Sequence, residues 1–278
     1  MFHGIVKKFR SASGVCDGFI KDAVRTNPVL PPNLLTYRFQ QFYAKEIRNT
    51  FFKEANLYLD KAIYQYILSR GLLKDGNFSW GAVTQYYANF FAISGLIRLF
   101  ESGFSRIGNA SIEVDSQEDI YRIRKISSEG LHRVVWGKYY ILFNAFDYKR
   151  EVFYNVYVPY EPGNYYFESD RRNNLNYDPG VGYQEIYQTT YTIRDLIKER
   201  VRDNYPKTSF SRSNEWLDLD TITQYRIRLL ANIISEIDKL SDFPLFCRER
   251  LSNRKKLVQK YEKDRKLRER VVEWLEGE

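Results

Sequence analysis

The chain of 278 residues contains little cysteine, histidine or methionine, with two, two and one of these residues respectively. Cys16 and Cys247 lie far apart and form no CxxC pair, so the sequence supports neither a disulfide framework nor a structural zinc site. We therefore expect two free thiols in a reducing, cytoplasmic compartment. We also expect no bound metal and no other cofactor.

Several signatures of known enzyme classes are absent. The sequence contains no GxxxxGK[ST], no GxGxxG after a predicted strand, no HExxH and no GxSxG. This excludes nucleotide hydrolysis of the P-loop type and serine hydrolysis of the elbow type. No apolar run reaches the roughly 18 residues of a membrane span, and the first residues lack the apolar core of a signal peptide. We expect a protein that is not secreted and has no membrane partner.

Aromatic residues and one block of positive charge are what the sequence has in excess. Tyr and Phe number 23 and 19, which supplies the apolar area for a substantial core and excludes disorder throughout. The net charge of +8 is unevenly placed, because residues 248–270 contain eleven Lys and Arg against four Asp and Glu. That segment carries +7, so the rest of the chain is nearly neutral.

The apolar pattern predicts a mainly α fold: a helical bundle with a small β-hairpin insertion and a long C-terminal basic helix. We expect an N-terminal arm over residues 1–35, where prolines prevent helix formation, and a helical body over 36–243. The body contains an inserted hairpin at about 111–126 and an inserted loop at about 151–183, a stretch rich in Gly, Pro, Asn and Asp. Residues 244–278 form the basic helix.

Within the body, apolar residues at three- and four-residue steps predict a first helix over about 36–70 that stops at Gly71. A second helix is predicted over about 79–100, where small residues such as Gly95 would let a neighbouring helix approach closely. Helix is also predicted from about His132, in the segment after Gly182, and over about 215–240.

His132 is the only histidine in the predicted body, and basic residues lie near it in the sequence. An imidazole has a pKa near neutrality, as a general base in metal-free RNA cleavage requires, and a nearby arginine would stabilise charge on the phosphate. The alternative is a structural histidine at the start of a helix, packed beside Trp136.

Two helical segments carry a resemblance to a known family. YYANFFAISGLIRL at 86–99 resembles the second helix of HEPN-type (higher eukaryote and prokaryote nucleotide-binding) domains, and GLHRVVWGKYY at 130–140 is similar to the histidine-containing segment that follows. RNNLNY at 172–177 and RVRDNY at 200–205 both resemble the family's motif of Arg, three residues, then a polar residue and Tyr. The similarity covers helices from about residue 39 to residue 240, with the hairpin and the 151–183 loop as insertions.

The resemblance implies a bundle of four or five helices that is often dimeric and that binds or cleaves RNA. Active RNases of the family carry an Arg followed after four to six residues by a His. This chain departs from that pattern, because neither Arg172 nor Arg200 is followed by a His at that spacing. Either the nuclease chemistry is lost, or His132 joins one of these arginines from another helix.

The predicted nucleic-acid contacts belong to the two Arg-containing motifs and to the outward face of the C-terminal helix. They are Arg171, Asn176, Tyr177, Asn204, Tyr205, Arg254, Lys255, Lys256, Lys260, Lys263, Arg265 and Lys266. Such a row of cations would give salt-sensitive, sequence-independent binding to RNA or DNA. The alternative is a solvated helix with internal pairs, such as Glu262 with Lys266.

These observations predict an RNA- or polyanion-binding protein of a bacterial defence or toxin–antitoxin system, with metal-independent endoribonuclease activity if it is an enzyme. RNA, a protein of the same system and further copies of the chain are the expected partners. The alternative is a non-catalytic adaptor that oligomerises through its aromatic helices and binds an acidic partner with its basic tail.

Overall fold

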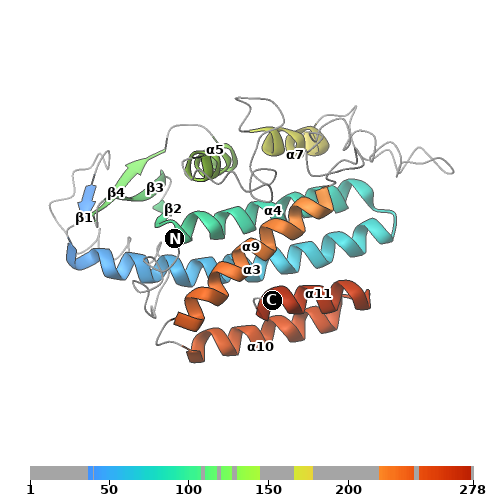
Figure 1. Cartoon of the computed structure of the whole chain (residues 1–278). Helices are drawn as coiled ribbons and strands as arrows, with labels where there is room; N and C mark the ends of the chain where they lie inside the picture. Colours follow the sequence, from blue (N-terminus) through green and yellow to red (C-terminus); the bar gives the residue numbers. More distant parts are fainter. Residues whose placement is uncertain are drawn as a thin grey trace.

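The computed structural model describes residues 37–39, 41–107, 110–117, 120–126, 130–144, 166–177, 219–240 and 244–276. Within these ranges the helices are α3 Gln41–Lys74, α4 Phe78–Leu99, α5 Leu131–Asn144, α7 Phe167–Tyr177, α9 Leu219–Leu240, α10 Pro244–Tyr261 and α11 Arg265–Glu276. The strands are β1 Tyr37–Phe39, β2 Ser102–Ile107, β3 Ala110–Gln117 and β4 Ile120–Lys125 (Figure 1). The predicted mainly α fold is confirmed.

The long hairpin of α3 and α4 forms the centre of the molecule. α3 does not stop at Gly71 as predicted but continues to Lys74, and the chain reverses at Gly76, whose φ of 84° suits glycine. A glycine inside a helix costs about 1 kcal/mol, and the packing of α3 against α4 outweighs that cost.

α4 is buried on both sides, because α3 covers one face and α9 covers another. A Cβ atom at Gly95 would lie 2.6 Å from Cδ2 of Leu230 on α9 and 3.3 Å from Cβ of Tyr58 on α3. The predicted close approach of a neighbouring helix is therefore confirmed.

The β-structure forms one antiparallel sheet with the strand order β1-β4-β3-β2. β3 and β4 form the predicted hairpin, in which Val114 pairs with Ile123. Two strands were not predicted: β2 precedes the hairpin, and β1 occupies residues where the first helix was expected to begin. The buried Arg98 of α4 joins the bundle to the sheet, since it pairs with Glu54 at 2.5 Å and donates to the carbonyl oxygen of Phe104 at 2.6 Å.

The prediction of one continuous helix over residues 244–278 is wrong, because the helix is interrupted at residues 262–264, between α10 and α11. Asp264 caps α11, and its Oδ1 accepts a hydrogen bond from the backbone N of Leu267 at 3.2 Å. The two helices form a hairpin that buries Val271 and Trp274 of α11, and α10 also contacts α3.

The predicted loop over 151–183 is wrong in its described part, because residues 167–177 form α7. Glu168 and Asp170 lie in the first turn of α7, where negative charge stabilises a helix. The N-terminal arm at 1–35 and the helix predicted after Gly182 lie outside the described residues.

Figure 1 shows two opposite faces of the bundle: α5 and α7 lie on one side of the layer made by α3, α4 and α9, and α10 and α11 lie on the other. Among the described helices, none combines the length and the apolar character that crossing a membrane requires.

We predict that Gly95→Ala lowers the free energy of unfolding by about 2 kcal/mol, because the new methyl group would overlap Leu230 in a packed interior. Gly71→Ala is the matched control. No atom lies within 4 Å of the Cβ position at Gly71, so the helix gains propensity and stability rises by about 0.5–1 kcal/mol. Urea unfolding of both variants measures the difference, and equal effects would contradict this account of the packing.

Candidate functional site

An aromatic and polar cluster lies where α4 meets α5. The hydroxyl oxygen of Tyr86 on α4 is 2.8 Å from Nδ1 of His132 on α5, and it accepts a hydrogen bond from Nε1 of Trp136 at 3.2 Å. The rings of His132 and Phe90 stack with their centroids 4.3 Å apart. His132 and Trp136 are four residues apart, as are Tyr86 and Phe90, so each pair lies on one face of its helix.

Arg172 on α7 reaches the same cluster. Its guanidinium carbon lies 5.6 Å from the ring centroid of Tyr86 and 6.0 Å from that of Tyr87. The His132 ring lies 5.8 Å and 5.9 Å from the same two centroids. The structure thus brings two of the three predicted catalytic residues to the same pair of tyrosine rings, while the third, Arg200, lies outside the described residues.

A buried polar network fixes α7, and with it Arg172, against α4 and α9. Oε1 of Glu168 lies 2.5 Å from Nη1 of Arg226 on α9, and their side chains are 9% and 6% exposed. The same Nη1 donates to Oδ1 of Asn89 on α4 at 3.0 Å, and Nδ2 of Asn89 donates to the Thr223 hydroxyl at 2.7 Å. Because Arg172 is one helical turn after Glu168, this network also sets the position of the Arg172 guanidinium.

The charges around the cluster leave a local positive excess. Glu168 pairs with Arg226, and Asp170 lies 3.7 Å from Arg133 in an exposed pair. In the part of the chain that the structure describes, no carboxylate pairs with Arg172, and its buried Nε has no hydrogen-bond partner.

Burial and this positive charge act on the two titratable groups of the cluster. Burial, and then the Arg172 guanidinium, lower the pKa of His132 from 6.5 to about 4. Burial raises the pKa of Tyr86 to about 12, against the lowering effect of the hydrogen bond from Trp136. At neutral pH the imidazole is therefore uncharged and the phenol is protonated.

The arrangement suits one anionic group that lies between a guanidinium and an imidazole. Arg172 would donate charge-assisted hydrogen bonds to the anion, and the anion would offset the positive field at His132. His132 presents Nε2 as a base when its Nδ1–H donates to Tyr86, so the Tyr86 hydroxyl determines which nitrogen is available. Across the described ranges, no three His, Cys, Asp or Glu side chains come close enough together to hold a metal ion.

The other predicted contacts of the two Arg-containing motifs are only partly described. Asn176 is half-buried near the end of α7, and Tyr177, the last residue of α7, is 75% exposed. Arg171 lies on α7, but its side chain is outside the described part, as are Asn204 and Tyr205.

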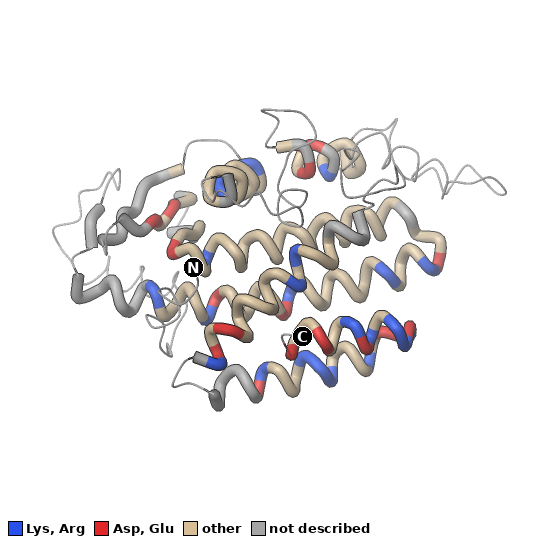
Figure 2. Tube along the Cα trace, in the orientation of Figure 1, with Lys and Arg blue, Asp and Glu red and all other residues tan. Residues whose placement is uncertain are grey.

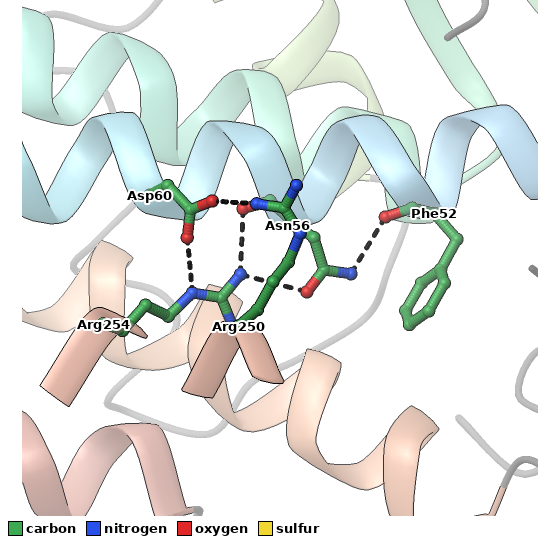
Figure 3. A network of polar contacts seen from close by, with 5 residues as sticks. All are labelled: Phe52, Asn56, Asp60, Arg250 and Arg254. Carbon is green, nitrogen blue, oxygen red and sulfur yellow. Dashed lines mark hydrogen bonds and ion pairs between the residues drawn. The ribbon is translucent and has the colours of Figure 1, made fainter. Parts of the chain in front are cut away.

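The prediction that Arg254 faces solvent is wrong, because its side chain is only 5% exposed. Its Nε lies 2.6 Å from Oδ1 of Asp60 on α3, and its Nη2 donates to the carbonyl oxygen and to Oδ1 of Asn56 at 3.0 Å (Figure 3). Arg250 binds the same Asp60 carboxylate. Arg254 therefore joins α10 to α3 and is not available as a nucleic-acid contact.

The other predicted cations of the C-terminal segment fall into two groups. Lys255 pairs with Glu276, and the exposed Arg265 pairs with Glu269 at 2.7 Å, so acidic residues of α11 offset part of the charge (Figure 2). The remaining four are exposed lysines: Lys256, Lys260, Lys263 and Lys266. The alternative pair of Glu262 with Lys266 is not the contact observed, since Glu262 is buried and accepts a hydrogen bond from the backbone N of Asp264.

The sequence did not predict a site role for Tyr86 of the cluster, nor for Glu168 and Arg226 of the buried polar network. One signal was available for Arg226, which lies among Thr223, Ile227 and Leu230 on the apolar side of α9. A charged residue on an apolar helix face indicates a buried partner. The identity of that partner could not be read from the sequence.

Comparisons of the chain with protein-family models, with curated proteins and with solved structures find no match.

We predict that Arg172→Gln raises the pKa of His132 from about 4, because it removes one of the two causes of the shift while burial remains. Proton NMR titration can follow this directly, since His3 is the only other histidine and is identified with a His3→Ala variant. Arg133→Gln is the matched control: Arg133 is exposed, pairs with Asp170 and is not a cause of the shift. A midpoint near 6.5 in the unmodified protein would contradict the described environment.

We predict that Arg254→Met lowers the free energy of unfolding by about 3 kcal/mol, because it breaks a buried ion pair, leaves Asp60 with Arg250 as its remaining arginine and removes the donor to Oδ1 of Asn56. Lys256→Met removes the same charge two residues away from an exposed position, and should change stability by less than about 0.5 kcal/mol. Chemical unfolding of both variants tests this, and similar losses would argue against a structural role for Arg254.

Proposed function

We propose that the protein binds RNA and holds one phosphate at the junction of α5 and α7, between Arg172 and His132. One observation carries this proposal: a half-buried guanidinium with no carboxylate partner among the described residues lies near the same two tyrosine rings as an uncharged imidazole. A phosphate oxygen satisfies the free hydrogen-bonding capacity of such a guanidinium.

The resemblance to HEPN-type domains supports the same proposal from the sequence. The segments 86–99 and 130–140 that carry it contribute Tyr86, His132 and Trp136, which contact one another. The family's arginine and histidine lie on one late helix, whereas here Arg172 and His132 come from two helices. We therefore propose an HEPN-like RNA-binding protein of the kind found in bacterial defence or toxin–antitoxin systems.

The same geometry permits metal-independent cleavage. Arg172 would hold the phosphate, and Nε2 of His132 would take the proton from the ribose 2′-hydroxyl as its oxygen attacks phosphorus. The bond to the 5′-oxygen then breaks, and that oxygen takes a proton from water. A pKa of about 4 makes His132 a weaker base than the near-neutral imidazole predicted from the sequence, but its base form is fully present above about pH 5. Activity should then be lost only below that pH, not near pH 6.5.

The adaptor alternative has less structural support. Its oligomer interface was expected on the aromatic helices 39–70 and 78–101, yet the large aromatic side chains there are mainly inside the molecule, as Phe51 and Tyr66 at 1% exposure illustrate. Tyr64 and Trp80, at 40% and 54% exposure, are the exposed large aromatic side chains described on α3 and α4. An interface on these helices would have to be built from few aromatic contacts.

We predict that Arg172→Gln weakens RNA binding on the order of tenfold, because a charge-assisted hydrogen bond to phosphate contributes about 1.5–3 kcal/mol. Fluorescence anisotropy with labelled mixed-sequence RNA in EDTA measures the binding, and gel analysis of the same samples measures cleavage. His132→Gln should abolish any cleavage and change binding much less.

Lys239→Gln is the matched control, since it removes one charge from an exposed pair in the last turn of α9. Unchanged binding in Arg172→Gln would overturn the proposed phosphate site. RNA that is bound but left intact by the unmodified protein would support the binding function and reject the cleavage step. Cleavage that persists in His132→Gln would remove His132 as the base.

A further inference from the structure

The exposed positive charge of the C-terminal segment is concentrated at the turn between α10 and α11. This hairpin turn, residues 256–266, contains five basic and two acidic residues; Arg265 pairs with Glu269 of α11, so the four lysines carry the charge that remains. Glu262 is buried, so Asp264 is the acidic side chain of the turn that faces solvent. Directly before this stretch on α10, Arg254 and Lys255 are already paired with carboxylates. The turn therefore presents the four exposed lysines that the described part of the segment offers to a ligand.

An exposed pair of aromatic rings lies beside these cations. Tyr261, the last residue of α10, and Tyr64 on α3 are 44% and 40% exposed. Their ring centroids are 6.3 Å apart, and the rings meet edge to face at 85°. Nζ of Lys260 lies 4.8 Å from the Tyr261 centroid. Exposed rings next to solvated lysines combine a stacking surface with an attraction for phosphate.

We infer that the hairpin turn binds a single-stranded stretch of RNA, with a base stacked on Tyr261 and phosphates near Lys256, Lys260 and Lys263. This inference rests on the proposed RNA-binding function and names the form of RNA that the protein takes. Unpaired bases expose their faces and can stack on aromatic side chains, whereas in a duplex the bases are stacked on one another inside the helix. Lysines alone would attract either form.

The position of the turn makes it a second contact, separate from the α5–α7 site. Figure 1 shows the turn between α10 and α11 on the face of the α3–α4 layer opposite to α7, toward the end of the bundle where α3 joins α4. Tyr64 anchors the turn to the second half of α3. An RNA strand that engages both sites has to pass around that end of the bundle, which a flexible single strand can do more easily than a duplex.

The test compares Tyr261→Ala with Tyr261→Phe in the full chain, using a labelled single-stranded RNA of mixed sequence and the corresponding duplex. We predict that Tyr261→Ala weakens single-strand binding about tenfold, the size expected for loss of one stacked base, while Tyr261→Phe keeps the ring and binds within about twofold of the unmodified protein. Duplex binding should be weaker and equal in all three proteins. Ile141→Ala, which trims a side chain that is 62% exposed on α5, is the control for loss of exposed apolar area.

Several outcomes would overturn the inference. The first is unchanged single-strand binding in Tyr261→Ala, and the second is an equal loss of duplex and single-strand binding in that variant. The third is that Tyr261→Ala loses binding of polyglutamate but not of RNA, which would indicate an acidic protein as the ligand. Arg172→Gln, measured in parallel, separates this inference from the proposed function. If only Arg172→Gln weakens binding, the hairpin turn is not the contact; if only Tyr261→Ala does, the α5–α7 phosphate site is wrong. No RNA binding by the unmodified protein would reject both.

Discussion

The buried ion pair between Glu168 and Arg226 is the contact on which the candidate site depends. Leu175 is the buried apolar side chain of α7 among those described, so apolar burial alone would hold this helix weakly. A buried charge that loses its partner is strongly destabilising, which makes the position of α7 over α4 and α9 a specific one. Arg172 is only one helical turn from Glu168, but the Glu168 carboxylate pairs with Arg226 instead. Arg172 therefore keeps its positive charge beside His132 and helps to lower the pKa of that imidazole.

The long helices of the bundle could be predicted because their apolar residues repeat at helical spacing and their cores are formed by neighbours in sequence. The ends of these helices could not be predicted from the sequence. Gly71 was predicted to stop α3, yet the helix continues because its packing against α4 outweighs the propensity of one residue, and the chain turns at Gly76. Residues 262–264 break the basic segment without a Gly or Pro to mark the break. There the hairpin forms because folding back lets both α10 and α11 bury apolar residues against the bundle.

His132 could be singled out from the sequence because histidine is so rare in the chain, but the helix that completes the site could not. The segment that forms α7 is rich in Asn and Asp, a composition typical of loops. The contact that holds α7 in place joins Glu168 to Arg226, which is 58 positions away in the sequence. The burial of Arg254 could not be predicted for the same reason, because its partner Asp60 is 194 positions away in the sequence. Local patterns predict which residues form a helix, whereas tertiary contacts decide which charged side chains are neutralised.

The net charge of a segment is a guide to binding only for those side chains that remain in solvent. In the basic C-terminal segment, Arg254 and Lys255 stabilise the fold through carboxylates of the same chain, while the lysines of the hairpin turn keep their hydration. Exposed lysines attract a polyanion over a range set by the Debye length, about 8 Å at physiological salt, and fix no geometry. A half-buried guanidinium such as Arg172 acts only at contact but with a defined direction. Because the two kinds of positive charge lie on opposite faces, the two proposed contacts with RNA can be altered independently by mutation (Figure 1).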